Sequence, residues 1–210
     1  MNRPDTRVAI LTFDGFNELD SLIAFALLQR VRKPGWRVTL CSPTPSVTSM
    51  HGLTVGAQST LADVCDADAV IVGSGVRTRE IANDAAILGA LRLDPARQLI
   101  AAQCSGTLLL AKLGLLGDAP ACTDLTTKPW VLEAGVRVLD EPIHANGNVA
   151  TAGGCMASAY LAAWVIARLA GTAAAVGALH YVAPVGEKDD YVARAMGHIA
   201  PFLPAAHATR

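Results

Sequence analysis

The sequence predicts an α/β protein whose mostly parallel sheet is covered by helices on both faces. Short, uniformly apolar runs alternate along the chain with helical or hairpin-like stretches, and strands that are apolar on both faces are typical of buried parallel sheets. The chain has 210 residues, of which 52% are hydrophobic, and this is enough for one sizeable core. Because no repeat or linker interrupts it, we expect a single domain over residues 1–210.

The first predicted strand is the apolar run from Val8 to Phe13. Apolar residues then recur at helical spacing from Leu19 to Val31, and Lys33-Pro34-Gly35 ends this helix. Three more apolar runs, bounded by polar or glycine-containing turns, predict strands at 36–41, 69–72 and 99–103.

Turn residues predict two hairpins and the start of a helical region. Residues 51–55 resemble part of a small hairpin, and 136–139 is expected to pair with 148–152 around Asn146-Gly147-Asn148. After Gly153-Gly154 the chain is rich in alanine and predicted to be helical to about Val182. A C-terminal helix follows, and the tail after Phe202 is expected to be loose.

Composition argues against several classes of partner. Only 17% of residues are charged and the net charge is −1, so no electrostatic footprint for nucleic acid or an anionic membrane is present. The longest apolar helix, 156–169, is shorter than the roughly 20 residues that span a bilayer. We therefore expect a small-molecule partner and no membrane association.

Five cysteines without CxxC spacing, and an N-terminus without the apolar region of a signal peptide, predict a cytoplasmic protein with reduced thiols. The five histidines show neither HxH nor HxxxH pairing, so no metal site is expected. Gly73-Ser74-Gly75 lacks the third glycine of a dinucleotide fingerprint and does not follow the first strand. We expect no cofactor.

The segment from Leu99 to Ala111 has the pattern of a nucleophile elbow. An apolar strand passes through Cys104 into an apolar helix, and the small residues Ser105 and Gly106 leave room for the sharp turn. A thiol at this corner faces a helix N-terminus, which favours the thiolate. The alternative is an unreactive core cysteine.

Other candidate residues follow the predicted strands, where ligands bind in open α/β sheets. The backbone N–H groups of Ser74 and Ser105 can stabilise developing negative charge. Two acids, Glu18 and Asp20, lie in the first turn of the first helix, where the helix dipole alone also favours acids. The remaining candidates for substrate binding are glycines, namely Gly73, Gly153 and Gly154.

Three segments together resemble the ThiJ/PfpI superfamily over roughly residues 7–182. They are Phe13 to Asp20 after the first strand, Cys104 at the elbow, and Thr151 to Gly154 before the long helix. The resemblance implies a flavodoxin-like three-layer α/β/α sandwich and a homodimer. It also implies that Cys104 is the reactive cysteine and that Asp20 is the acid that hydrogen-bonds it.

Departures from the family pattern narrow the expected activity. The protease-like branch has histidine directly after the cysteine, where this chain has Ser105, and many relatives have Thr-Thr-His where it has Thr123-Asp124. The closest resemblance is to isocyanide hydratases, which pair an aspartate with Cys-Thr at the elbow. This implies hydration of an isocyanide to a formamide through a thioimidate on Cys104, with Asp124 as a possible supporting group. Alternatives are a glyoxalase or deglycase acting on 2-oxoaldehydes, and a non-catalytic redox or metabolite sensor.

Overall fold

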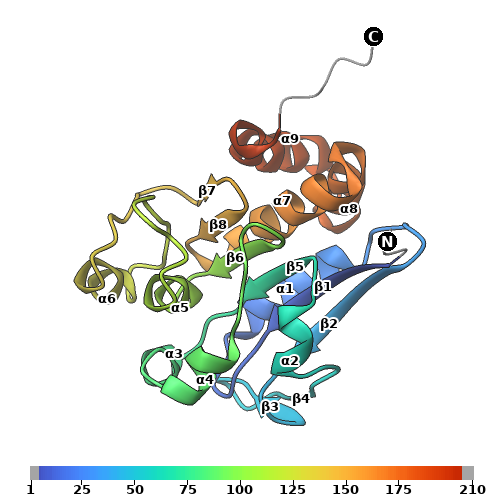
Figure 1. Cartoon of the computed structure of the whole chain (residues 1–210). Coiled ribbons are helices and arrows are strands. Elements are labelled where there is room, and N and C mark those ends of the chain that lie inside the picture. Colours follow the sequence, from blue (N-terminus) through green and yellow to red (C-terminus); the bar gives the residue numbers. More distant parts are fainter. Residues whose placement is uncertain (1–4, 205–210) are drawn as a thin grey trace.

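A computed structural model describes residues 5–204 and shows a six-stranded sheet in the order β2-β1-β5-β6-β8-β7 (Figure 1). All neighbouring strands are parallel except β7, which is antiparallel to β8. The strands are β1 (Thr6–Leu11), β2 (Trp36–Cys41), β5 (Ala69–Val72), β6 (Leu99–Gln103), β7 (Ile143–Asn146) and β8 (Val149–Ala152). The mostly parallel sheet confirms the predicted fold class.

Helices cover both faces of the sheet, as the flavodoxin-like sandwich requires. One face packs against α1 (Glu18–Leu28), α7 (Ser158–Ala170), α8 (Thr172–Val182) and α9 (Lys188–Ile199). The other face packs against α2 (Leu61–Cys65), α3 (Thr78–Ile81), α4 (Ala85–Ala90), α5 (Gly106–Lys112) and α6 (Lys128–Glu133). Two 3₁₀ turns, η1 (Cys155–Ala157) and η2 (Ala200–Phe202), flank the C-terminal helices.

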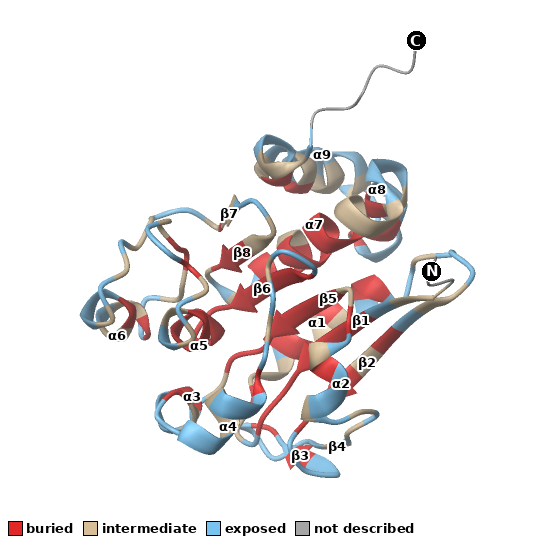
Figure 2. Cartoon of the chain, viewed as in Figure 1, coloured by how far each residue is buried: buried red, intermediate tan, exposed pale blue. Residues whose placement is uncertain are grey.

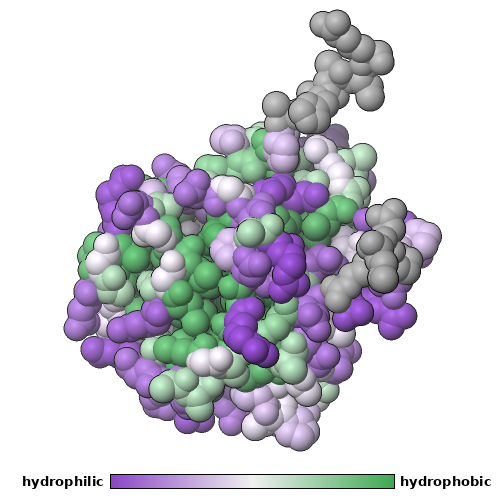
Figure 3. Space-filling model, in the orientation of Figure 1, coloured by the Kyte–Doolittle hydropathy of each residue, from purple (hydrophilic) through white to green (hydrophobic). Residues whose placement is uncertain are grey.

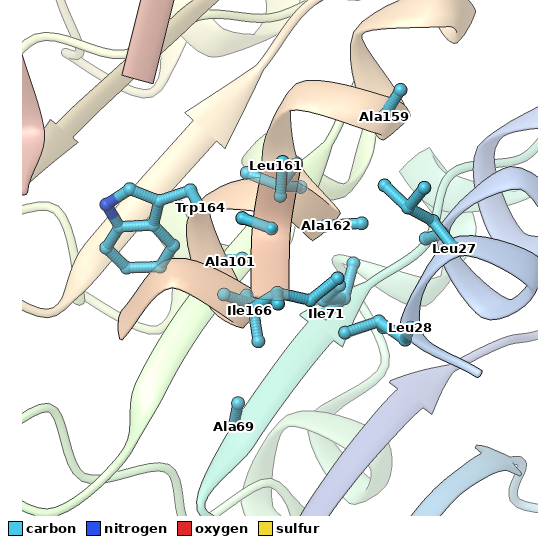
Figure 4. Packing of buried hydrophobic residues seen from close by; sticks show 14 of the residues in the cluster. Leu27, Leu28, Ala69, Ile71, Ala101, Ala159, Leu161, Ala162, Trp164 and Ile166 are labelled. Carbon is cyan, nitrogen blue, oxygen red and sulfur yellow. The ribbon is translucent and has the colours of Figure 1, made fainter. Parts of the chain in front are cut away.

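Successive side chains of the central strands supply the two cores in turn. In β1, Val8 and Ile10 belong to one core, whereas Ala9 and Leu11 belong to the other, because side chains alternate across a strand. This explains why the central strands are apolar throughout and buried (Figure 2). Figure 4 shows α7 and the end of α1 packed on the β5 and β6 side chains of the first core.

The structure confirms the first predicted hairpin and corrects the second. The first pairs β3 (Ser46–Thr48) with β4 (Thr54–Gly56), so residues 51–55 lie in its connection and at the start of β4. In the second, β7 rather than 136–139 pairs with β8. Val138 instead forms an isolated bridge with Ala121. The turn at Asn146-Gly147 lies where the sequence predicts it. The strand that enters this turn is β7, which directly precedes it, rather than 136–139.

The C-terminal part is helical as predicted, but the chain turns at Gly171, where φ is 92°, and so divides into α7 and α8. Among residues 5–204, no helix is long and apolar enough to cross a membrane. The loose tail expected after Phe202 falls mostly on residues 205–210, which lie outside the described residues.

Candidate active site

Cys104 occupies a strained corner between β6 and α5. Its φ is 48°, and every other positive φ in the part of the chain that the structure describes belongs to a glycine. Such a conformation is costly for an L-residue and is held by its surroundings. The Cys104 N–H donates to the Ala152 carbonyl at 2.8 Å, and the Thr123 hydroxyl donates to the Cys104 carbonyl at 2.8 Å. These contacts form the nucleophile elbow.

Close packing against the neighbouring strand keeps this elbow tight. A Cβ on Gly106 would lie 2.6 Å from the Val72 carbonyl oxygen and 2.7 Å from that of Gly73. Only glycine therefore allows the first turn of α5 to approach the end of β5 so closely.

The Cys104 sulfur is almost enclosed, with the residue 3% exposed, and it accepts a hydrogen bond from Gln103. The Gln103 Nε2 atom lies 3.3 Å from Sγ and 2.9 Å from the Gly154 carbonyl oxygen, so this amide links the elbow to the turn after β8. We did not predict a role for Gln103. The available signal was a polar residue at the end of an otherwise apolar strand, directly before the cysteine.

Asp20 lies on the first turn of α1 and is fully buried beside the sulfur. One of its carboxylate oxygens, the Cys104 Sγ and the Cys155 Sγ all lie within 4.8 Å of one another. The Ser74 hydroxyl donates to Oδ2, whereas Oδ1 has no hydrogen-bond partner among the described residues. The structure therefore places the carboxyl next to the sulfur, which also accepts the hydrogen bond from the Gln103 amide.

Burial determines the protonation of this pair. Burial raises the pKa of Asp20, although hydrogen bonds with Ser74 and the two nearby thiols partly oppose it. Burial also raises the pKa of the Cys104 thiol, and the adjacent Asp20 carboxylate raises it further. The expected preference for thiolate at the helix N-terminus is thus wrong for the resting pair, because α5 has only seven residues and desolvation of the sulfur is the larger effect.

A second thiol, Cys155, faces the same place from the turn before α7. Asn17 caps α1 by accepting the Leu19 N–H at 3.1 Å, and its side-chain Nδ2 donates to the Cys155 sulfur at 3.3 Å. The sequence pattern predicted no role for Cys155. Its proximity to Asp20 and Cys104 depends on a contact between residues 138 positions apart in the chain.

The predicted binding loop after β5 is held by side chains from three elements. Gly73 donates its N–H to Leu11 at 2.9 Å. The Ser105 hydroxyl accepts the Gly75 N–H at 3.1 Å and is bonded to the Thr78 hydroxyl at 2.8 Å. Ser105 therefore braces the loop. The backbone N–H groups of Ser74 and Ser105 have no acceptor within residues 5–204 and remain available to a ligand.

Gly153 and Gly154 line a neighbouring hollow together with Asp124, and of these three residues only Asp124 also lines the pocket at Cys104. A Cβ on Gly153 would lie 2.2 Å from the Thr123 carbonyl oxygen, so only glycine fits there. Asp124 accepts the N–H groups of Thr126 and Thr127, both at 2.9 Å, and thereby shapes the loop before α6.

Glu18 is directed away to the β3–β4 hairpin. Its carboxylate accepts hydrogen bonds from the Ser49 hydroxyl and from the His51 N–H at 3.2 Å, and lies 3.0 Å from the His51 ring. These contacts lower the pKa of Glu18 to about 2. Glu18 therefore fixes the hairpin to the start of α1 and is not part of the pocket lining.

The elbow opens into a pocket of about 440 Å³. Its described lining contains two thiols and one acid, Asp124, and neither a histidine nor a basic side chain. The lining residues are Asn17, Met50, Ser74, Gly75, Val76, Cys104, Ser105, Asp124, Thr126, Thr127, Trp130 and Cys155. The sulfurs and the Asp20 oxygen are also a donor set that a soft cation could bridge.

The fold and site define an α/β sandwich protein with a buried cysteine at a nucleophile elbow and an acid beside it. The sequence model of the DJ-1/PfpI family matches residues 6–168. The chain belongs to this family, which contains cysteine-dependent enzymes and DJ-1-like proteins.

Solved structures share the fold. A ThiJ/PfpI family protein from Pseudomonas syringae has a TM-score of 0.75 and 20% identity, covering 95% of this chain and 91% of the other. Schizosaccharomyces pombe DJ-1 has a TM-score of 0.74 and 14% identity, covering 85% and 100%. Drosophila melanogaster DJ-1beta has a TM-score of 0.74 and 20% identity, covering 85% and 97%. At such identities the likeness shows the fold alone. A search of curated proteins returns no match.

Proposed function

We propose that the protein is a cofactor-independent lyase that hydrates an isocyanide to an N-substituted formamide. The observation that carries the proposal is the pairing of Cys104 with a buried aspartic acid in a pocket whose described lining has no histidine or fixed cation. Such a pocket favours a neutral electrophile, and it offers a proton carrier beside the nucleophile.

The reaction needs three successive proton transfers, to carbon, to nitrogen and back to sulfur. As Cys104 Sγ attacks the terminal isocyanide carbon, Asp20 takes the thiol proton and delivers it to that carbon, which gives a thioimidate. Water then adds to the same carbon, and its proton passes through Asp20 to nitrogen. Finally the carbon–sulfur bond breaks, the hydroxyl proton returns to sulfur, and the formamide leaves. The raised pKa of Asp20 suits this role, because a readily protonated acid both donates and accepts.

Neighbouring groups would assist the proposed reaction without gaining or losing a proton themselves. The free N–H groups of Ser74 and Ser105 are available to stabilise negative charge on the substrate, and the Gln103 amide supports the sulfur when it carries charge. Gly73, Gly153 and Gly154 shape the loops that hold these groups, and Asp124 lines the substrate side. All five cysteines are free thiols, in keeping with the reducing cytoplasm where we place the protein.

The test is incubation of the purified protein with cyclohexyl isocyanide and, separately, with methylglyoxal. We expect formamide from the first, and a whole-protein mass increase equal to the isocyanide when the reaction is quenched early. Cys104→Ser should abolish both signals, whereas Cys65→Ser should retain them, because Cys65 lies on α2 outside the pocket lining. A chelator should have no effect. Lactate without formamide would overturn the proposal in favour of the glyoxalase alternative. The absence of both products would also overturn it.

A further inference from the structure

We propose that Cys104 and Cys155 form a reversible disulfide, so that the pocket is also a dithiol redox site that reacts with low-molecular-weight disulfides. Both cysteines line this pocket, and their sulfurs lie within 4.8 Å of each other. A disulfide bond is about 2.05 Å long, so the sulfurs must approach by less than about 3 Å. This is within the range of side-chain rotation and a small shift of one short turn.

The surroundings differ between the two sulfurs in a way that assigns their roles. Cys104 is almost fully buried, whereas Cys155 is half-buried and stands at the first position of the three-residue turn η1. Burial and the Asp20 carboxylate raise the pKa of the Cys155 thiol, and the hydrogen bond that Asn17 donates to its sulfur partly opposes this rise. Cys155 is therefore the thiol that an incoming disulfide meets first, and Cys104 is the thiol that resolves the intermediate.

Asp20 completes the set, because one of its carboxylate oxygens is within 4.8 Å of both sulfurs and Oδ1 has no partner among the described residues. An unpaired buried oxygen is costly, and here it is positioned to accept a thiol proton. The other cysteines lack this arrangement. The Cys41 sulfur lies 2.7 Å from the Ser59 hydroxyl, and the Cys65 sulfur lies 3.5 Å from the Ala90 carbonyl oxygen.

The electrons balance with a disulfide RSSR as the oxidant. The Cys155 thiolate attacks one sulfur of RSSR and releases one thiol RSH, leaving a mixed disulfide on Cys155. Cys104 then attacks the Cys155 sulfur, its proton passes by way of Asp20 to the departing RS sulfur, and the second RSH leaves. Two protein thiols are oxidised and one RSSR is reduced. In the proposed hydratase this removes the nucleophile from use, but the disulfide itself does not depend on that activity.

Peptide mapping tests the pairing. The reduced native protein is treated with bis(2-hydroxyethyl) disulfide, quenched in acid, alkylated in denaturant and digested with trypsin without reduction. Lys and Arg positions place Cys104 in peptide 98–112, Cys122 in 113–137 and Cys155 in 138–168, with Cys41 and Cys65 together in 38–77. We expect peptide 98–112 joined to 138–168 as the dominant cross-linked species, two hydrogen masses below the sum of the separate peptides, and its loss after dithiothreitol.

Single variants give each step its own signature. Cys104→Ser should leave Cys155 as a stable mixed disulfide, and Cys155→Ser should abolish the cross-link. Cys65→Ser should form the cross-link as the wild type does. Circular dichroism of each variant is the control that tests whether it is folded. Mixed disulfides on both sulfurs without a cross-link, or a cross-link that forms only in denaturant, would overturn the proposal. Formamide production by the reduced protein is measured separately, so either proposal can fail without the other.

Discussion

At the scale of single residues, the proposed chemistry depends on proton transfer between Cys104 and Asp20. Burial raises the pKa of both groups, and the Asp20 carboxylate contributes a further increase to that of Cys104. The acid therefore has two opposing effects on the nucleophile. It stabilises the protonated, resting thiol, and it supplies the proton transfers that turnover needs.

Asp20→Asn separates these two effects, since it keeps the shape but removes both the charge and the proton transfer. We expect hydration of isocyanide to slow by roughly 10²-fold or more. Alkylation of Cys104 by iodoacetamide at pH 8 should become faster, because removal of the carboxylate lowers the pKa of the thiol. Timed labelling with peptide mapping measures the second effect independently of substrate.

Glu18→Gln is the matched control, because Glu18 lies two residues away on the same helical turn but bonds to the hairpin. It should leave both rates close to those of the wild type. Wild-type turnover in Asp20→Asn together with loss of turnover in Glu18→Gln would show that we have assigned the wrong acid.

At the scale of elements, α1 and the β3–β4 hairpin are joined through the Glu18 carboxylate. The side chain is 21% exposed and binds Ser49 and His51, which hold its pKa at about 2, below the ordinary value of 4.5. A lowered carboxyl pKa means that the folded state binds the proton less tightly than the unfolded state. The stabilisation is complete above pH 4.5 and is lost as the pH falls towards about 2.

We therefore expect Glu18→Gln to be less stable than the wild type at pH 6, with the difference shrinking as the pH approaches 2.5. Urea unfolding at both pH values measures this. Ser49→Ala should also reduce the pH-dependent part of the stability, because Ser49 supplies the largest lowering of the Glu18 pKa. If the wild type and Glu18→Gln lose stability in parallel between these pH values, the carboxylate does not connect the two elements.

At the scale of the whole molecule, apolar surface remains exposed on a chain with few charges. Figure 3 shows apolar residues gathered across the middle of one face, with hydrophilic residues around them. Near the pocket mouth, Leu19 is 50% exposed, Met50 40% and Met156 63%. Leu19 lies two residues after Asn17, and the Met50 N–H donates to the Phe16 carbonyl. Met156 follows Cys155, whose sulfur accepts a hydrogen bond from Asn17.

The family resemblance implies a homodimer. We predict that the second copy covers Leu19, Met50 and Met156 and forms part of the pocket wall. Sedimentation at micromolar concentration should give twice the 21.8 kDa chain mass. The double variant Leu19→Asp, Met156→Asp should shift the protein to monomer, whereas Val185→Asp should not, since Val185 lies on the loop before α9. A wild type that sediments as a strict monomer would contradict the prediction.

Elements with a strong local pattern were predictable. The strand boundaries at 36–41, 69–72 and 99–103 coincide with the observed strands. For 69–72 and 99–103 the reason is that a buried parallel strand needs a nearly unbroken apolar run. The strand that pairs with β8 was placed wrongly, since β7 has only four residues and two of them, His144 and Asn146, are polar. Such a short, mixed run carries a weaker signal than an apolar run.

The sequence by itself determined the fold class, the elbow at Cys104 and the presence of an acid in the first turn of α1. These features depend on apolar periodicity and on residues close together in the chain. The family resemblance named Asp20 as the acid beside the sulfur. Tertiary structure alone decided the contact between Gln103 and the sulfur and the convergence of Cys155 on the same pocket. Ser74 reaches Asp20 across 54 residues, and Asn17 reaches Cys155 across 138. Such contacts, and the burial that raises both pKa values, arise only when the sheet brings its loops together.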